Sequence, residues 1–226
     1  LIGRSAHVSG IFFGVEDWRK NVIQGKKAQL INFPNIPLDG FSEMQKAYIA
    51  NGVALEQNKG YKCSIRDNWY SIPSVWSPDA FFLRRNNLYP KLVLNRCNAV
   101  STDTMHRIRF NNNVDHEIVL LSYYNSISFA FTELCGRSYG GGVLEILPSE
   151  VDKIILPIIH DLDEFKKHSL LYDIDRIVRN KLNIEEALDL VDKAILIDQL
   201  NLDIETCKEF RAIWKKLQSR RLGRGV

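Results

Sequence analysis

The stretch from Gly136 to Glu150, which reads GRSYGGGVLEILPSE, organises the rest of the chain. An apolar run with helical spacing precedes it, and a helical region follows it. Its three successive glycines allow backbone angles that other residues avoid, and they leave the main-chain amides unshielded. The arginine, the hydroxyl, the aromatic ring and the open amides together suit a phosphate group. The alternative is a tight turn between a helix end and a short strand, without a ligand.

The run from Val114 to Cys135 gives the strongest helix signal in the chain. Asp115 is a suitable N-cap, and Gly136 occupies the C′ position, where glycine commonly ends a helix. Apolar and aromatic residues cover most of the helical circumference, which predicts a buried central helix whose rings pack in the core. After the glycines we expect a strand over Val143–Leu147.

Residues 61–110 have the texture of β-structure, with short runs of aromatic and β-branched residues between turn-forming ones. In the last run, alternation places Arg107 and Arg109 on one face and buries Ile108 and Phe110. The basic face of this strand suits either a nucleic acid or solvent. The predicted strands are Tyr61–Ile65, Ala80–Arg84, Lys91–Asn95 and Met105–Phe110.

The N-terminal part reads as strand, helix, strand, over residues 11–13, 16–24 and 29–33. A short amphipathic helix over residues 41–49 should end near Gly52. One face of that helix is expected to hold Phe41, Met44, Tyr48 and Ile49.

The C-terminal part, from His160 onward, is helical and acidic. Asn183 and Glu186 can form a capping box, and a last helix is predicted from Asp203 to about Leu222. Its basic end suits the negative pole of a helix dipole and either touches a phosphate backbone or is solvated. The cations there are Arg211, Lys215, Lys216, Arg220, Arg221 and Arg224.

These elements predict an α+β fold. A mixed or antiparallel, β-rich region surrounds the central buried helix over residues 1–158, and a helical region follows over residues 159–226. The composition, 45% apolar and 25% charged, is that of an ordinary globular chain, and no apolar run approaches the ~20 residues that span a bilayer. The start of the chain lacks a methionine and resembles no signal peptide, so we expect a cytoplasmic piece of a longer protein.

The charge distribution is more informative than the net charge of +3. Residues 61–110 hold eight basic side chains against three acidic ones, whereas residues 151–210 hold 14 acids against eight bases. A polyanion would therefore be attracted to the central segment, unless the clustering only reflects a solvated surface. The four cysteines form no C-x-x-C pair, which disfavours a zinc site of the usual spacing and indicates reduced, mostly buried thiols.

Catalytic signatures are missing from the sequence. The glycines are not followed by Gly-Lys-Ser or Gly-Lys-Thr, and no H-E-x-x-H or G-x-S-x-G motif occurs. Serine, aspartate and histidine occur together in residues 101–106, but a triad is defined by geometry and not by proximity in the chain. We therefore predict no catalytic, cofactor-binding or metal-binding residue in this chain.

Five short stretches together resemble the C-terminal half of adenine-specific DNA methyltransferases of restriction–modification systems, over about residues 8–200. In that family this half is the target-recognition region, which grips duplex DNA. An N-terminal Rossmann-like domain binds S-adenosylmethionine and transfers the methyl group. The stretches are YKCSIR (61–66), WYSIP (69–73), LVLN (92–95), STDTMHR (101–107) and GRSYGGGVLE (136–145).

The sequence departs from the full family pattern in one respect. It has neither a glycine-rich S-adenosylmethionine loop nor the Asn/Asp-Pro-Pro-Tyr/Phe motif that holds the flipped adenine. The resemblance thus implies a DNA-reading portion without its catalyst. Its partners would be double-stranded DNA and its own N-terminal methyltransferase domain, where the cofactor binds.

The resemblance also implies roles for individual residues. Basic side chains and the glycine stretch would hold phosphates, and loops near the aromatic and arginine pairs would reach base edges in the major groove. The phosphate candidates are Lys62, Arg66, Arg107, Arg137, Ser138, Tyr139, Gly140, Gly141 and Gly142. The base-reading candidates are Trp69, Tyr70, Arg84, Arg85 and Asn86.

Two other interpretations remain open from the sequence. The acidic helical region from His160 to Asn201 is poorly suited to DNA and fits a module that docks a partner subunit or a second copy of the chain. The aromatic and basic mixture at Tyr61–Tyr70 would also suit a single-stranded nucleic acid.

Overall fold

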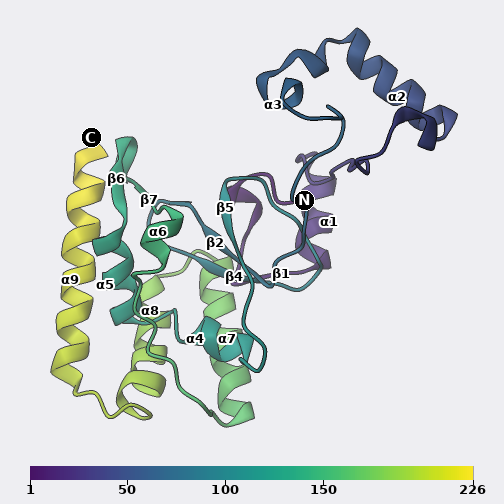
Figure 1. Ribbon diagram of the computed structural model, residues 1–226. Coiled ribbons are helices and arrows are strands. Elements are labelled where there is room, and N and C mark those ends of the chain that lie inside the picture. The colour runs from purple at the N-terminus through teal and green to yellow at the C-terminus, as the bar shows by residue number, and fades with distance from the viewer. Residues whose placement is uncertain (226) are drawn as a thin grey trace. The chain divides into compact units, whose positions relative to one another are not determined.

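The chain folds into two compact units, which a computed structural model describes over residues 1–225 (Figure 1). The first unit combines Leu1–Ala28 with the chain from Ser77 onward, and the second is Gln29–Trp76. Within residues 1–225, no helix has the length and apolar character needed to cross a membrane. Each unit has its own hydrophobic core, and each is described separately below.

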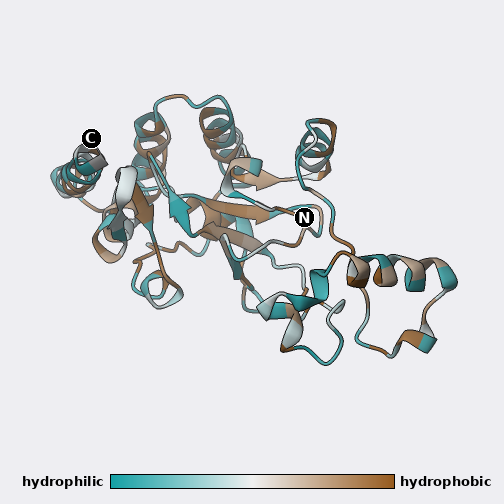
Figure 2. Cartoon of the chain, turned by 90° about the horizontal axis from the view of Figure 1, so that it is seen from above, coloured by the Kyte–Doolittle hydropathy of each residue, from teal (hydrophilic) through white to brown (hydrophobic). Residues whose placement is uncertain are grey.

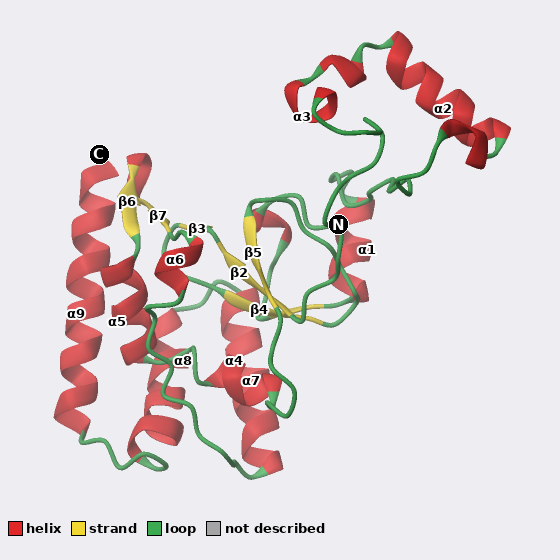
Figure 3. Cartoon of the chain, viewed as in Figure 1, coloured by secondary structure: helices red, strands yellow, loops and turns green. Residues whose placement is uncertain are grey.

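The main sheet of the first unit has four strands in the order β1-β4-β2-β5 (Figure 3). β1 runs parallel to β4, and the other neighbours are antiparallel. The α+β class is confirmed, as are the three strands predicted between residues 80 and 110, with ends shifted by one or two residues. The strands are β1 (Phe12–Phe13), β2 (Ala80–Leu83), β4 (Leu92–Asn95) and β5 (Met105–Ile108).

Both faces of this sheet are covered. Alternation sends Ala80 and Phe82 into a large core with the helices, and Phe81 and Leu83 into a smaller core with the N-terminal segment. Since the strands are buried on both sides, they read as continuous apolar runs, and they are coloured brown at the centre of Figure 2. Arg107 lies on β5 opposite Phe81 and is half-buried, whereas Arg109 follows the strand and is exposed.

Helices fill the rest of the first unit. The larger core includes side chains from the main sheet and from both the central and the C-terminal helices. The residues on both sides of position 159 belong to the first unit. The helices are α1 (Val15–Ile23), α4 (His116–Leu121), α5 (Ser126–Cys135), α6 (Pro148–Val151), α7 (Glu164–Arg179), α8 (Ile184–Val191) and α9 (Ile204–Leu222), with a π-helical segment Asp192–Ile197 and short 3₁₀ turns Ser5–His7 and Gly223–Gly225.

The predicted single helix over Val114–Cys135 is interrupted, and this prediction was wrong in length. Asp115 caps α4 as expected, but α4 ends at Leu121 and α5 starts only after Asn125. The Asn125 side chain accepts a hydrogen bond from the Ser128 N–H and donates one to the Ser122 carbonyl. These local bonds replace the helical ones, because a short polar side chain competes for the backbone. Tyr123 and Tyr124, between the two helices, and Phe129, on α5, are buried in the core, as predicted.

Gly136 ends α5 for a different reason from the predicted one. Its φ of −74° and ψ of 173° are extended and open to any residue, so no left-handed cap forms. A Cβ atom at this position would lie 2.6 Å from Leu144 Cδ1. Close packing against Leu144 of β7 and the Thr132 carbonyl therefore favours glycine at this position.

A second, three-stranded antiparallel sheet has the order β3-β7-β6. The 3₁₀ turn Gly140–Gly142 joins β6 to β7, with positive φ at its last two glycines. The predicted glycine turn is confirmed, and it connects two strands instead of a helix and a strand. The chain runs from β2 through Arg84 directly into β3, so one extended segment contributes a strand to each of the two sheets. The strands are β3 (Arg85–Asn86), β6 (Arg137–Tyr139) and β7 (Val143–Glu145).

The second unit is helical. α2 (Glu43–Ala54) confirms the predicted helix over residues 41–49, but it begins two residues later and runs two residues past Gly52. Ser42 and Gln45 form a capping box at its start. Its apolar face is narrower than predicted, because Met44 and Tyr48 are exposed. A small core of Phe41, Ile49 and Tyr70 holds this unit together, with Phe33 and Trp69 packed against it. The short elements are α3 (Tyr61–Ser64) and the 3₁₀ turns Leu38–Gly40 and Gln57–Lys59.

Two predicted strands are absent from this unit. Residues 61–65 instead begin a helical turn, in which the N–H groups of Cys63 and Ser64 both donate to the Gly60 carbonyl. Residues 29–33 make a single bridge, from Phe33 to Ser71. Both segments have strand-like composition, but neither has a neighbouring strand with which to form a ladder.

Candidate nucleic-acid interface

The three-stranded sheet gathers many of the predicted contact residues. We call this the hairpin surface and define it by Arg84, Arg85, Arg137, Ser138 and Tyr139 together with the Gly140–Gly142 turn. The register places Arg85 and Arg137 on opposite sides of one residue, Glu145. All three residues of the edge strand β6 are exposed.

Two acidic side chains hold the arginines by their Nε atoms. Glu145 Oε1 lies 3.2 Å from Arg84 Nε and 3.1 Å from Arg85 Nε, and Glu150 Oε1 accepts from Arg137 Nε at 2.6 Å. Both carboxylates are nearly buried, whereas the Arg85 and Arg137 side chains are 61% and 63% exposed. None of these contacts uses the terminal Nη atoms of Arg85 or Arg137. The carboxylates thus hold the two arginines through Nε, and the exposed side chains keep their Nη donors for other partners.

An exposed aromatic ring completes the surface. The Arg85 guanidinium lies 5.8 Å from the centre of the Tyr139 ring, within the range of a cation–π contact. Gly140 and Gly141 have open space where a side chain would be, so a ligand can approach their backbone. Gly142 is buried against Leu222 of α9, and the predicted close approach of a ligand does not fit this third glycine.

Glu150 is the anchor of Arg137. Burial alone would raise the pKa of its carboxyl group, but hydrogen bonds from the Leu147 N–H and from Arg137 lower it further than burial raises it. The net effect is a pKa below the ordinary value. Glu150 therefore stays ionised beside Arg137, and it also satisfies the N-terminus of α6.

Acidification is expected to weaken the fold through Glu150. Because its pKa is depressed in the folded state, the carboxylate adds stability above its ordinary pKa, and this is lost as pH falls through the folded-state pKa. Glu150→Gln should be less stable than wild type at pH 7 and lose less stability below about pH 4, measured by urea unfolding at each pH. Glu16→Gln, which alters an exposed carboxylate, is the control. Parallel pH curves for wild type and Glu150→Gln would contradict this role.

Two predicted base-reading residues do not fit that role. Asn86 is 5% exposed, and its amide donates to the Leu83 carbonyl and accepts from the Lys91 N–H. Tyr70 is 8% exposed, and its hydroxyl donates to the Ile36 carbonyl. Both polar groups are used within the fold, so these residues support the structure instead of facing a ligand.

Of the remaining predicted contacts, Arg107 lies on β5 of the main sheet, and the others lie in the second unit. Lys62 and Arg66 line an open cavity of about 870 Å³, whose other polar wall residues include Asn35 and Asn68. Arg66 Nη1 donates to the carbonyls of two nearby loop residues at 3.4 and 3.1 Å, which fixes its position at the cavity wall. Trp69 packs against Gly52 and is half-buried, so most of its ring serves the small core.

Sequence reasoning missed the two acids that orient the arginines. For one of these acids, Glu145, the sequence contains a usable signal. Glu145 and Arg137 lie at equal distances along the chain from the centre of the glycine turn. Residues placed symmetrically about a hairpin turn face each other across the two strands. His106, next to Arg107 on β5, has its Nε2 2.7 Å from the Ile146 carbonyl oxygen.

The described residues contain no group of three or more His, Cys, Asp and Glu side chains able to hold a metal ion. All four cysteines are free, and only Cys207 is fully buried, so the expectation of mostly buried thiols was wrong. The hairpin surface offers positive charge, hydrogen-bond donors and an aromatic ring. These are the groups that contact phosphates and bases in protein–nucleic acid complexes.

An α+β domain with a cationic hairpin is consistent with the resemblance to DNA methyltransferase C-terminal regions. Residues 1–196 match the family model of the C-terminal domain of the type II methyltransferase M.Eco57I. The match covers most of the chain, so the chain belongs to this family. No curated protein and no solved structure gives a significant match. α9 lies beyond the matched residues.

Proposed function

We propose that this chain is the duplex-binding, sequence-reading region of an adenine-specific, S-adenosylmethionine-dependent DNA methyltransferase of a restriction–modification system. Family membership gives the methyltransferase part of this proposal. The observation that carries the DNA-binding part is the pair of arginines, Arg85 and Arg137, that flank Glu145 on an exposed sheet. Methyl transfer would be carried out by an N-terminal catalytic domain, which binds the cofactor.

The geometry suits a phosphate backbone. Arg85 and Arg137 stand two strands apart, which places them roughly 10 Å from each other at the usual spacing of neighbouring strands. Each bonds its carboxylate anchor through Nε, and a guanidinium can bind a phosphate through its two terminal nitrogens. Tyr139 and the open amides of Gly140 and Gly141 add hydrogen-bond donors beside them, whereas the Ser138 side chain lies on the opposite face of β6.

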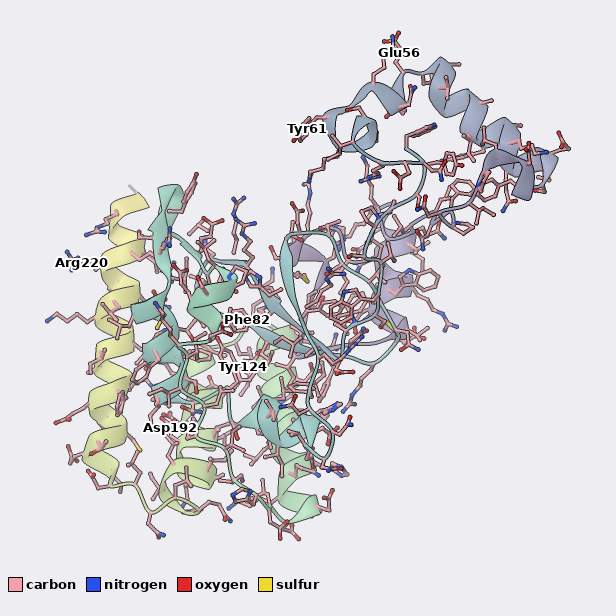
Figure 4. All side chains as sticks on the ribbon, in the orientation of Figure 1. Glu56, Tyr61, Phe82, Tyr124, Asp192 and Arg220 are labelled. Carbon is pink, nitrogen blue, oxygen red and sulfur yellow. The ribbon has the colours of Figure 1, made fainter. Side chains whose placement is uncertain are left out.

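The second unit supplies another candidate contact. Lys62 and Arg66 bring positive charge to the wall of its cavity, and Tyr61 exposes its ring at the same edge (Figure 4). A cavity with planar, amide and cationic groups can receive either a backbone phosphate or the edge of a base. We assign Lys62 and Arg66 to phosphate contacts in this proposal.

The double variant Arg85→Gln, Arg137→Gln is expected to weaken duplex binding and to flatten its salt dependence. Each lost phosphate contact lowers the slope of log K against log [salt] by about 0.9, so the double variant should lose about 1.8. Fluorescence anisotropy with a labelled duplex between 50 and 200 mM NaCl would measure this.

The matched control is Arg19→Gln, Arg176→Gln, which removes two arginines that are also ion-paired but lie on α1 and α7. Its slope should equal that of wild type. A wild-type chain that fails to bind duplex DNA at 50 mM NaCl would reject the proposal.

The alternative role, docking of a partner subunit through the C-terminal helices, has one supporting observation. Phe165 and Tyr172 stand seven residues apart on α7, hence on one face, and both are exposed. Light scattering on the samples used for the DNA-binding measurements separates DNA binding from docking. A chain that self-associates and does not bind DNA would favour the docking role.

A further inference from the structure

The C-terminal half of α9 carries cations that lie outside the residues matched to the family. Lys216, Arg220 and Arg224 follow one another at intervals of four residues, so they form a single row along one face of the helix and the turn after it. All three are exposed, and the Arg220 side chain projects from α9 on the side away from α5 (Figure 4). We call these residues the α9 row.

The α9 row is not ion-paired with acidic side chains in the part of the chain that the structure describes. No acid follows Glu209 in the sequence. The other cations of α9 are ion-paired: Lys208 with Glu205, Arg211 with Asp192, Lys215 with Glu185 and Arg221 with Glu133. Within residues 1–225, no ion pair joins the row to a carboxylate. The row therefore keeps its full charge for a ligand.

Arg221 fixes the row beside the hairpin surface. It is buried, and it donates to both carboxylate oxygens of Glu133, at 2.6 and 3.0 Å. It also donates to the carbonyl of Asn87, at 2.7 Å, and to the carbonyl of Gly142 in the glycine turn. The end of α9 is thus bound to the loop after β3 and to the turn between β6 and β7.

The charges favour an anion despite the direction of the helix dipole. The C-terminus of a helix carries about −0.5 of an elementary charge, which disfavours a phosphate. Three full positive charges within about 12 Å of helix outweigh it. Leu222 is in contact with Gly142, so the C-terminal end of α9 adjoins the glycine turn, and a polyanion on Arg85 and Arg137 would reach the row by passing over that end of the helix.

We infer that Lys216, Arg220 and Arg224 form a second phosphate-binding element, which continues the hairpin surface along the backbone of duplex DNA. The inference rests on the proposed function of the chain. It extends the DNA-binding region beyond the part that matches the family. It also gives Arg221 a positioning role, because that residue holds the two elements in one rigid arrangement.

The test compares the intact chain with the triple variant Lys216→Gln, Arg220→Gln, Arg224→Gln, using a labelled duplex of unrelated sequence. Three lost phosphate contacts should reduce the salt slope by about 2.7, so the affinity loss between 50 and 200 mM NaCl should be about 40-fold smaller than in wild type. The control triple Lys166→Gln, Lys193→Gln, Lys208→Gln removes three exposed positive charges from the acidic region. Its slope should change by less than one.

Each outcome decides the inference. A wild-type slope in the row variant, together with a reduced slope in the Arg85, Arg137 double variant, overturns the inference and leaves the proposed function standing. Equal losses in the two triple variants show a general effect of net charge and also overturn it. A wild-type chain that does not bind the duplex rejects both. Thermal unfolding should match wild type, because the substituted side chains are exposed, and the single variant Arg220→Glu gives the same direction of change with one substitution.

Discussion

Replacing Arg221 by alanine is expected to lower the free energy of unfolding by about 3–5 kcal/mol. Arg221 is 3% exposed, and its loss leaves the buried carboxylate of Glu133 without a counter-charge. The carbonyls of Asn87 and Gly142 lose their donor at the same time. Urea unfolding followed by circular dichroism measures the change, and the neighbouring exposed variant Arg220→Ala should stay within about 0.5 kcal/mol of wild type.

A second variant separates the electrostatic contribution of Arg221 to the free energy of unfolding from its packing contribution. The double variant Glu133→Leu, Arg221→Met removes both charges and keeps apolar volume, so it should recover much of the lost stability. If Arg221→Ala lost less than about 1 kcal/mol, the buried pair would not be the anchor that the structure indicates.

Replacing Phe129 by alanine should also lower the free energy of unfolding by about 3–5 kcal/mol. The ring is fully buried at the centre of the larger core, and its centre lies 5.4 Å from that of Trp214, 5.7 Å from Tyr123 and 5.9 Å from Tyr124. Its removal leaves a cavity between α5 and α9 that rigid neighbours cannot close.

Phe165→Ala is the matched control, since this ring is 84% exposed on α7. Its effect should remain within about 0.5 kcal/mol. The Phe129 variant should unfold at lower urea concentration with an unchanged denaturant slope, because the same surface is exposed on unfolding. Similar midpoints for the two variants would show that the core is not built around Phe129.

The sequence predicted the parts of the fold in which local pattern and burial agree. β2 and β4 were recognisable as short apolar runs, and the last helix was predicted to within one residue of the start of α9. Residues 61–65 have equally strand-like composition but form a helical turn, because a strand also needs a partner, which composition does not reveal. The break at Asn125 was missed because one side-chain hydrogen bond decided it.

The candidate nucleic-acid interface, like the fold, could be predicted from the sequence only in part. The arginines and the glycine turn stood out as a motif, and the structure brings Arg85, Arg137 and Tyr139 into one sheet. Asn86 failed as a ligand-facing residue because its amide is buried by contacts with its own turn. Gly142 failed because α9, about 80 residues later in the sequence, covers it, and only the tertiary fold carries such information.

The route of the chain has an evolutionary consequence. Gln29–Trp76 leaves the first unit after Ala28 and the chain rejoins it at Ser77, so the sheet and its helices are built from the segments on either side. The small core of this segment contains no residue of the main sheet, so we expect substitutions within it to leave the register of that sheet unchanged. The segment could then vary in sequence, or be exchanged, while the first unit is inherited unchanged.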